Sequence, residues 1–287
     1  MSIDLHQHST FSDGVSSLVE LVQRAKSRSV TAMALTDHDT IAGLEECARL
    51  AAEAQVQFLP GVEFEASEGP HVLGYFGGLP GPAVVEASEY YRAFKTRALK
   101  TIIQKLQAVG FSLDQEAILL RAGAGTPSIA HIVAEMFELG TLSSQDRGNA
   151  EFSHYSQLVG PQGLAPVPDH SNCQWPVRRL VEMLRASGAV AVLAHPEKKH
   201  RRLWSEMIEA GLQGVEAYNR HSHVRGDTTD FVDLAKDYRL IVTGGWDFHG
   251  DPDANGVARF LGMPTCDLTG FAPPDELLGP LLDQLEI

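Results

Sequence analysis

Residues Thr31–Asp39, TAMALTDHD, indicate the fold, because an apolar run of strand length ends directly in charged side chains. Upstream, IDLHQH at Ile3–His8 has the same form, and Ser17 with Glu20 makes a capping-box pattern that predicts a helix reaching about Arg28. Strand, helix and strand in this order are typical of parallel pairing with right-handed crossovers. The opening of the chain therefore predicts an α/β fold.

The same alternation continues outward from this stretch. A helix is predicted over 41–54, extended chain over Gln57–Ala66 and a strand over His71–Phe76. Further along, predicted helices and strands alternate over 177–187, 189–194, 203–210, 214–218, 228–238, 240–243, 259–262 and 275–285. We expect residues 1–78 and 177–287 to form one barrel.

The stretch between these two parts has a different rhythm. It begins at the Gly/Pro-rich break Gly77–Pro82 and then reads mainly as helices and loops. A long helix is predicted over Pro82–Val109, a short one over Leu113–Arg121, a third starting at Thr126-Pro127, and irregular chain over 157–172. Residues 79–176 are therefore expected to form a helical insertion that caps the substrate.

Composition bounds the possible partners. The chain has 287 residues, of which 44% are hydrophobic and 21% charged, as is usual for a globular protein. No apolar run approaches the roughly 18 residues that a membrane span needs. The net charge of −14 disfavours binding to long nucleic acid, although metal ions would still allow a small anion to bind. The sequence predicts no oligomeric state.

Cysteines indicate the compartment. Cys47, Cys173 and Cys266 are few, odd in number and far apart, which argues against a disulfide framework. The first residues carry neither a basic segment nor an apolar one, so no secretory signal is visible. We expect a cytoplasmic protein.

Histidine and carboxylate side chains gather where the predicted strands end. In a parallel barrel these ends meet on one face, where barrel enzymes build their sites. Imidazoles and carboxylates together suit divalent transition metals. The candidate ligands are His6, His8, Asp13, His38, Glu63, His71, His195, Asp247 and His249. They are too many for one tetrahedral ion, so we expect two or three ions with Glu63 bridging.

Simpler explanations exist for individual residues. Asp37 and Asp39 are also placed to cap the following helix, and His71 could be a buried residue that is only hydrogen-bonded. A metal-stabilised barrel without catalytic activity is the corresponding alternative for the whole chain. The joint occurrence of candidate ligands at successive strand ends favours the metal site.

Five segments together resemble the polymerase and histidinol phosphatase (PHP) superfamily. These segments are His6–Gly14, Leu35–Thr40, Gly61–Phe64, Ala194–Pro196 and Gly245–Gly250. The sequence is similar to the small stand-alone phosphoesterases of this superfamily, which include nucleoside 3′,5′-bisphosphate phosphatases and 5′-to-3′ exoribonucleases. The resemblance implies a distorted (β/α)7 barrel with a helical insertion, holding two or three divalent ions of manganese, iron or zinc.

The resemblance also implies how the ligands divide. The first ion would be held by His6, His8, Glu63 and Asp247. The second would be held by Glu63, His71 and His195, and the third by Asp13, His38 and His249. Asp13 stands where other branches of the superfamily have histidine.

The substrate side departs from the family pattern. The insertion of similar enzymes carries Gly-Arg-Pro-His, whose Arg and His contact a substrate phosphate, whereas this chain has Thr126 and Ser128 at those places. Arg97 matches the family and Arg220 is an addition, so all four are candidate substrate contacts. Lys95 and Lys100 are expected to form a solvated face of the long helix.

The expected function is metal-dependent hydrolysis of a small, nucleotide-like phosphate ester, in which hydroxide held between two ions attacks phosphorus. His221, His223 and Asp37 are the candidate catalytic residues, and either histidine would bind phosphate or protonate the leaving oxygen. A cyclic phosphodiester, an oligoribonucleotide end, and a sugar or biosynthetic phosphate remain alternative substrates.

Overall fold

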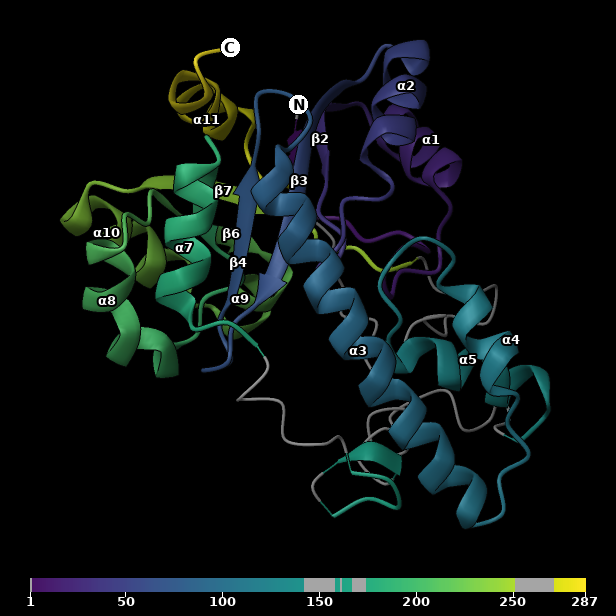
Figure 1. Ribbon diagram of the computed structural model, residues 1–287. Helices are drawn as coiled ribbons and strands as arrows, with labels where there is room; N and C mark the ends of the chain where they lie inside the picture. Colours follow the sequence, from purple (N-terminus) through teal and green to yellow (C-terminus); the bar gives the residue numbers. More distant parts are fainter. Residues whose placement is uncertain (1, 142–157, 161, 167–173, 251–270) are drawn as a thin grey trace.

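A seven-stranded mixed sheet, nearly closed into a barrel, forms the centre of the computed structural model (Figure 1). The structure describes residues 2–141, 158–160, 162–166, 174–250 and 271–287. In spatial order the strands are β1 Ser2–Asp4, β2 Val30–Leu35, β3 Gln57–Glu65, β4 His71–Tyr75, β5 Val190–Leu193, β6 Gly214–Asn219 and β7 Ile241–Gly245. The Leu5 amide donates to the Gly244 carbonyl at 3.2 Å, which brings β1 against β7.

One strand runs against the others. The pairs β1–β2, β2–β3, β5–β6 and β6–β7 are parallel, as expected, but β4 is antiparallel to both β3 and β5. Only five residues separate Glu65 from His71, which is too short for a parallel crossover and long enough for a hairpin. The expectation of parallel pairing throughout was therefore wrong at β4. The reversal puts the first residue of β4 beside the last residues of β3.

Helices surround this sheet, with two exceptions (Figure 1). The helices are α1 Leu18–Ser27, α2 Leu44–Ala54, α3 Pro82–Ala108, α4 Gln115–Arg121, α5 Ile129–Glu138, α7 Val177–Ala186, α8 Trp204–Glu209, α9 Arg220–Arg225, α10 Thr228–Tyr238 and α11 Leu278–Leu285. The exceptions are α4 and α5, which lie away from the sheet beyond α3. Two 3₁₀ turns, η2 Lys198–Leu203 and η3 Asp275–Leu277, precede α8 and α11.

The barrel interior is apolar at one end. Side chains from β1, β2, β4 and β5 pack there against Leu278 and Leu281 of α11. Ile241 and Val190 belong to the same cluster and open their strands, so α11 covers the amino ends of the strands. The carboxyl ends remain for the polar residues.

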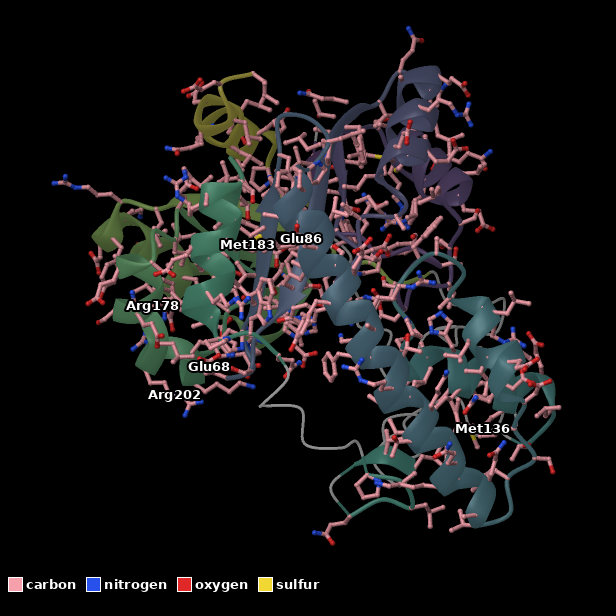
Figure 2. All side chains as sticks on the ribbon, viewed as in Figure 1. Glu68, Glu86, Met136, Arg178, Met183 and Arg202 are labelled. Carbon is pink, nitrogen blue, oxygen red and sulfur yellow. The ribbon has the colours of Figure 1, made fainter. Side chains whose placement is uncertain are left out.

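Helix α3 belongs to two apolar cores. Its first half, with Tyr91 and Phe94, packs against the barrel and α7. Its second half, with Leu99 and Ile102, packs with α4 and α5 in a separate cluster. Figure 2 shows Met183 on α7 and Met136 on α5 on either side of α3. One continuous helix therefore packs against the barrel with its first half and against α4 and α5 with its second half.

Local signals located most helix starts. The Ser17–Glu20 capping box is present at α1. Helix α2 begins at Leu44, three residues later than expected. Helix α5 begins at Ile129 with Ser128 as its N-cap, so the expected start at Thr126-Pro127 was wrong by two residues. The predicted strand at 259–262 and half of the predicted irregular chain at 157–172 lie outside the described residues. No helix in the described part of the chain is both long and apolar enough to cross a membrane.

Candidate metal centre

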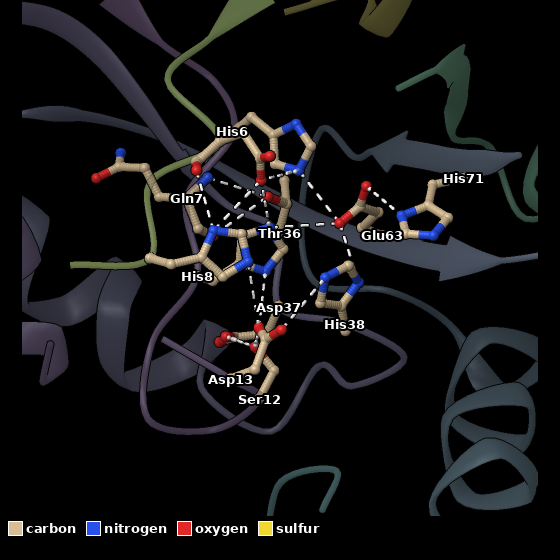
Figure 3. Close-up of polar contacts among 12 residues, drawn as sticks. His6, Gln7, His8, Ser12, Asp13, Thr36, Asp37, His38, Glu63 and His71 are labelled. Atoms are coloured by element: carbon tan, nitrogen blue, oxygen red, sulfur yellow. Dashed lines mark hydrogen bonds and ion pairs between the residues drawn. The ribbon is translucent and has the colours of Figure 1, made fainter. Parts of the chain in front are cut away.

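The candidate ligands come together at the carboxyl ends of the strands (Figure 3). His6 and His8 follow β1, where Gln7 between them bridges to Phe248 after β7. His38 follows β2, Glu63 lies near the end of β3, and the antiparallel β4 brings its first residue, His71, to the same face. His195 follows β5, and Asp247 and His249 follow β7.

Glu63 is in contact with five imidazoles. Its Oε2 lies 3.0 Å from His38 Nδ1, 3.2 Å from His6 Nε2 and 3.3 Å from His8 Nε2. Its Oε1 lies 3.0 Å from His71 Nδ1 and 2.9 Å from His195 Nε2. The two oxygens of one buried carboxylate thus face two different sets of ring nitrogens (Figure 3).

Two other carboxylates complete the cluster. Asp247 Oδ1 lies 3.2 Å from His8 Nε2 and 3.5 Å from His6 Nε2. Asp13 Oδ1 lies 3.4 Å from His249 Nε2. All nine candidate ligands belong to at least one of four groups whose ligand atoms lie within 4.8 Å of one another. His8 joins the group of Asp13 as well as that of Asp247.

Several of these ligand atoms are buried without a hydrogen bond. Among the described residues, His6 Nε2, both ring nitrogens of His8 and Glu63 Oε2 have no partner with hydrogen-bond geometry. Unpaired buried polar atoms are costly, and a bound cation would satisfy the three that lie together, His6 Nε2, His8 Nε2 and Glu63 Oε2. The donor set of imidazole and carboxylate fits a divalent transition metal.

Mutual attraction shifts the pKa values of the carboxylates. Burial would raise the pKa of Glu63, but the imidazoles of His38 and His6 outweigh it and hold that pKa well below its usual range. Burial likewise opposes the effect of His249 and His6 on Asp247, whose pKa also falls well below normal. Both carboxylates are therefore anionic at neutral pH.

The pKa values of the imidazoles are raised or lowered according to the groups that surround each ring. Burial would lower the pKa of His71, but Glu63 raises it to about 9, and Asp13 with Asp247 raises the pKa of His249 to about 9 in the same way. Burial prevails at His38 and lowers its pKa to about 3. In the absence of metal ions, protons on some imidazole rings thus balance the negative charge of the carboxylates. Metal ions would compete with those protons for the ring nitrogens.

The backbone is strained at three places in this cluster. Asp39, His195 and Asp247 have φ values of 56°, 24° and 46°, in the left-handed region that costs a residue with a side chain about 1–3 kcal/mol. The Asp39 amide donates to the Glu63 carbonyl at 2.8 Å. Such strain persists only where surrounding contacts hold it, which marks this face as a built site.

Glu216 is a site residue that sequence reasoning did not assign. It is fully buried on β6, with Oε1 2.9 Å from His6 Nδ1, and it accepts from the His195 amide at 2.8 Å through Oε2. It therefore orients one candidate ligand and holds the strained backbone of another. A carboxylate inside the apolar run Gly214–Tyr218 was the available signal.

Lys95 is the second such residue, and the expectation of a solvated face was wrong for it. Its ammonium group makes a close ion pair with Asp39 and lies 3.5 Å from Glu65 Oε2. Only 21% of its side chain is exposed. Lys95 lies four residues after Tyr91 and four before Leu99, both buried on α3, and this spacing could have suggested burial.

The two aspartates after β2 do not cap helix α2, whose N-cap is Gly43. Asp37 Oδ1 accepts from the Ser9 amide at 2.7 Å and the Ser12 hydroxyl at 2.6 Å, and its Oδ2 accepts from the Ser9 hydroxyl at 2.7 Å. Burial raises the pKa of Asp37 despite these bonds. These contacts make Asp37 a support of the loop that follows His8.

The two candidate catalytic histidines lie at different distances from the cluster of candidate ligands. His221 Nε2 lies 2.9 Å from Asp247 Oδ2, directly at the cluster, and 27% of its side chain is exposed. His223 is exposed, and its ring packs against Phe271 with centroids 5.2 Å apart. Arg220 is partly buried and Arg97 exposed, and neither forms an ion pair within the described ranges.

The hydroxyls in the altered insertion motif are used in structural contacts. Thr126 is buried, and its hydroxyl donates to the Asp39 carbonyl at 3.2 Å. The Ser128 amide donates to His131 Nδ1 at 2.9 Å, and its hydroxyl lies 3.0 Å from the same nitrogen, in the cap of α5. These bonds compete with any contact to a substrate phosphate.

Comparisons with known proteins agree with this geometry. Residues 4–103 match the sequence profile of the PHP domain. Over 257 residues the chain is 31% identical to a phosphoribosyl 1,2-cyclic phosphate 1,2-diphosphodiesterase of Eggerthella lenta, covering 86% of this chain and 94% of that protein. Over 260 residues it is 29% identical to a 3′,5′-nucleoside bisphosphate phosphatase of Chromobacterium violaceum, covering 86% and 87% respectively.

A solved structure from Bifidobacterium adolescentis, provisionally assigned as a metal-dependent phosphoesterase, has the same fold. Its TM-score is 0.80 at 23% identity, with 98% of this chain and 95% of that one covered. The profile match, the relative of nearly equal length and the clustered ligands lead to one conclusion. The chain belongs to the PHP domain family of metal-dependent phosphoesterases.

Proposed function

We propose that this phosphoesterase hydrolyses a small, nucleotide-like phosphate ester with two or three divalent cations held by the nine clustered residues. The observation that carries the proposal is Glu63, whose two oxygens face two sets of imidazoles. Bound there, the cations would neutralise phosphoryl oxygens and lower the pKa of water. Manganese, iron and zinc all fit the donor set.

The ligands would divide around Glu63. His6, His8 and Asp247 lie on the Oε2 side, and His71 and His195 on the Oε1 side. Asp13, His38 and His249, with the second nitrogen of His8, would form the third group. Glu63 is the natural bridge because its oxygens belong to different groups.

Other residues of this chain would handle the substrate. His221 is bonded to Asp247 and partly exposed, so it can reach a leaving oxygen and deliver a proton. Arg220 and Arg97 are candidate phosphate clamps because their charges are uncommitted among the described residues. His223 is a more remote candidate. Asp37 would act by positioning the loop after His8.

The insertion is proposed to cap the substrate. Residues 79–176 touch the metal centre through Lys95 and Thr126, both of which contact Asp39. We also propose a cytoplasmic location, which rests on the sparse cysteines alone.

A cyclic phosphodiester is the second candidate substrate. In the bisphosphate phosphatases that the sequence resembles, Arg and His of the insertion hold a further phosphate, and here Thr126 and Ser128 are engaged elsewhere. A charge-assisted bond contributes about 1.5–3 kcal/mol against about 0.5–1.5 for a neutral one. We therefore expect weak hydrolysis of adenosine 3′,5′-bisphosphate. The relative that is 31% identical is named for a cyclic phosphate.

A phosphate-release screen tests these proposals. Metal-loaded protein should be assayed with Mn²⁺ on nucleoside monophosphates and bisphosphates, cyclic sugar phosphates, short oligoribonucleotides and sugar phosphates, with a chelator-treated sample as control. We expect turnover that chelation abolishes, with bisphosphate not the preferred substrate. Preference for the bisphosphate would refute the specificity argument, and inactivity on the whole panel would favour a metal-stabilised scaffold.

A further inference from the structure

Lys95 lies where the two cores of α3 meet. The residue before it, Phe94, packs into the barrel core, and Leu99, one turn later, packs into the insertion core. A lysine at this junction with only 21% of its side chain exposed loses most of its hydration. Its burial therefore requires specific partners.

Those partners belong to the rim of the metal centre. The ammonium group contacts Asp39, which is fully buried, and lies 3.5 Å from Glu65 Oε2. Asp39 Oδ2 has no other partner among the described residues. Without Lys95, the buried carboxylate of Asp39 would have no cationic partner among the described residues.

Asp39 in turn connects several parts of the site. Its amide donates to the Glu63 carbonyl at 2.8 Å, and its Oδ1 accepts from the Glu65 amide at 3.3 Å. Its carbonyl accepts from Thr126 of the insertion, and its φ of 56° is strained. It directly follows His38, whose Nδ1 lies 3.0 Å from Glu63 Oε2.

We propose that Lys95 is a positioning residue of the metal centre, which holds the strained Asp39 and thereby fixes His38 against Glu63. The proposal rests on the metal-binding part of the proposed function. Without the ammonium group, the buried Asp39 carboxylate would seek water or a proton, and the left-handed backbone beside His38 would relax. In the wild-type protein, the long helix α3 would thus influence the metal centre through the side chain of Lys95.

The test is a variant series measured first by Mn²⁺ affinity, using calorimetric titration of chelator-stripped protein. Lys95→Met should weaken Mn²⁺ binding by about 10–100-fold, the usual cost of losing a partner of a ligand-bearing segment. Lys95→Arg, which keeps the charge, should retain most of the affinity. Lys95→Met with Asp39→Asn should bind no more weakly than Lys95→Met alone, because both changes break one connection.

Arg121→Met is the matched control. Arg121 makes ion pairs with Glu135 and Glu138 inside the insertion, at 2.6 Å each, away from the barrel. The Arg121→Met variant should lower the urea midpoint of the metal-stripped protein without changing its affinity for Mn²⁺. If Lys95→Met changes only the urea midpoint, as the control does, the positioning role is refuted.

Further outcomes separate the two proposals. Loss of Mn²⁺ affinity in Lys95→Met, in a protein that hydrolyses nothing on the phosphate-ester panel, would support Lys95 and refute the proposed function. Where a substrate is found, kcat should fall more than KM rises, because the metal centre and not substrate contact is disturbed. If Lys95→Met is insoluble, Lys95→Gln takes its place, and unchanged affinity there overturns the proposal.

Discussion

Glu63 explains why the site needs cations. Five imidazoles surround this one carboxylate, and each ring can offer a lone pair to a metal ion once its proton has left. The carboxylate has two oxygens, and each faces its own set of rings. This geometry favours a bridging ligand over an ordinary ion pair.

At the same scale, Asp247→Asn should lose both metal and turnover. Asp247 Oδ1 contacts His6 and His8, and its Oδ2 contacts His221, so the change removes a ligand charge and weakens the hold on a candidate proton donor. We expect activity to fall by more than about 100-fold, since losing a ligand's partner alone costs 10–100-fold. Elemental analysis and phosphate release measure the effect. Exposed Asp233→Asn is the control, and undiminished turnover would exclude Asp247 as an essential ligand.

Glu216→Gln should weaken metal binding by about 10–100-fold. An amide can still accept from His6, but its NH₂ group would then meet the His195 amide, donor against donor. Metal titration of stripped protein measures the loss, with exposed Glu182→Gln as control. Affinity equal to that of the wild type would show that Glu216 does not orient His6.

The sequence located the candidate ligands better than their supports. The clustered ligands recur at successive strand ends, and the barrel topology brings such ends together, so their proximity could be predicted. Glu216 is a single charged residue inside an apolar run, whereas Lys95 stands among other polar residues of a long helix, and no spacing rule identifies the partner of either. Their roles depend on contacts between segments far apart in the chain.

At the scale of elements, the antiparallel direction of β4 in its hairpin with β3 was the main feature that the sequence did not predict. Apolar character predicted both strands, but strand direction depends on the length of the connection, which is short here. The reversal matters because His71 opens β4. In a parallel strand the same residue would lie at the opposite end of the barrel, away from Glu63.

Gly125 sets the close approach of the insertion to the loop after His8. A Cβ there would lie 1.8 Å from the Phe11 carbonyl oxygen, the same oxygen that accepts from the Thr126 amide at 2.8 Å. Gly125→Ala should therefore reduce the free energy of unfolding by about 1–3 kcal/mol. Urea unfolding measures it, with Gly78→Ala as control because nothing lies near its Cβ. Equal stability of the two variants would contradict this packing.

The η2 turn should make stability depend on pH. His200 is buried, its Nδ1 accepts from the Glu197 amide at 3.2 Å, and burial lowers its pKa to about 4. The unfolded chain, with a pKa near 6.5, binds a proton first, so stability is lost as pH falls from about 6.5 to about 4. His200→Asn keeps an acceptor without this titration.

The difference between wild type and His200→Asn isolates that effect, because the metal-site groups titrate in both proteins. Urea midpoints of stripped protein should fall more steeply in the wild type between those pH values. Parallel curves would mean that His200 is equally basic in the folded and unfolded states. The sign follows from the lowered pKa, since a raised one would have made stability grow on acidification.

At the scale of the whole molecule, charge limits what can reach the metal centre. The net charge of −14 repels a polyanion, while bound cations would attract a single phosphate locally. We therefore expect no shift of long duplex DNA in a gel at physiological salt with micromolar protein, with or without Mn²⁺. A short oligoribonucleotide should still compete with a small phosphate ester, because one terminal phosphate needs no extended basic groove. A salt-sensitive shift of duplex DNA at sub-micromolar protein would reveal a basic surface and overturn the restriction to small substrates.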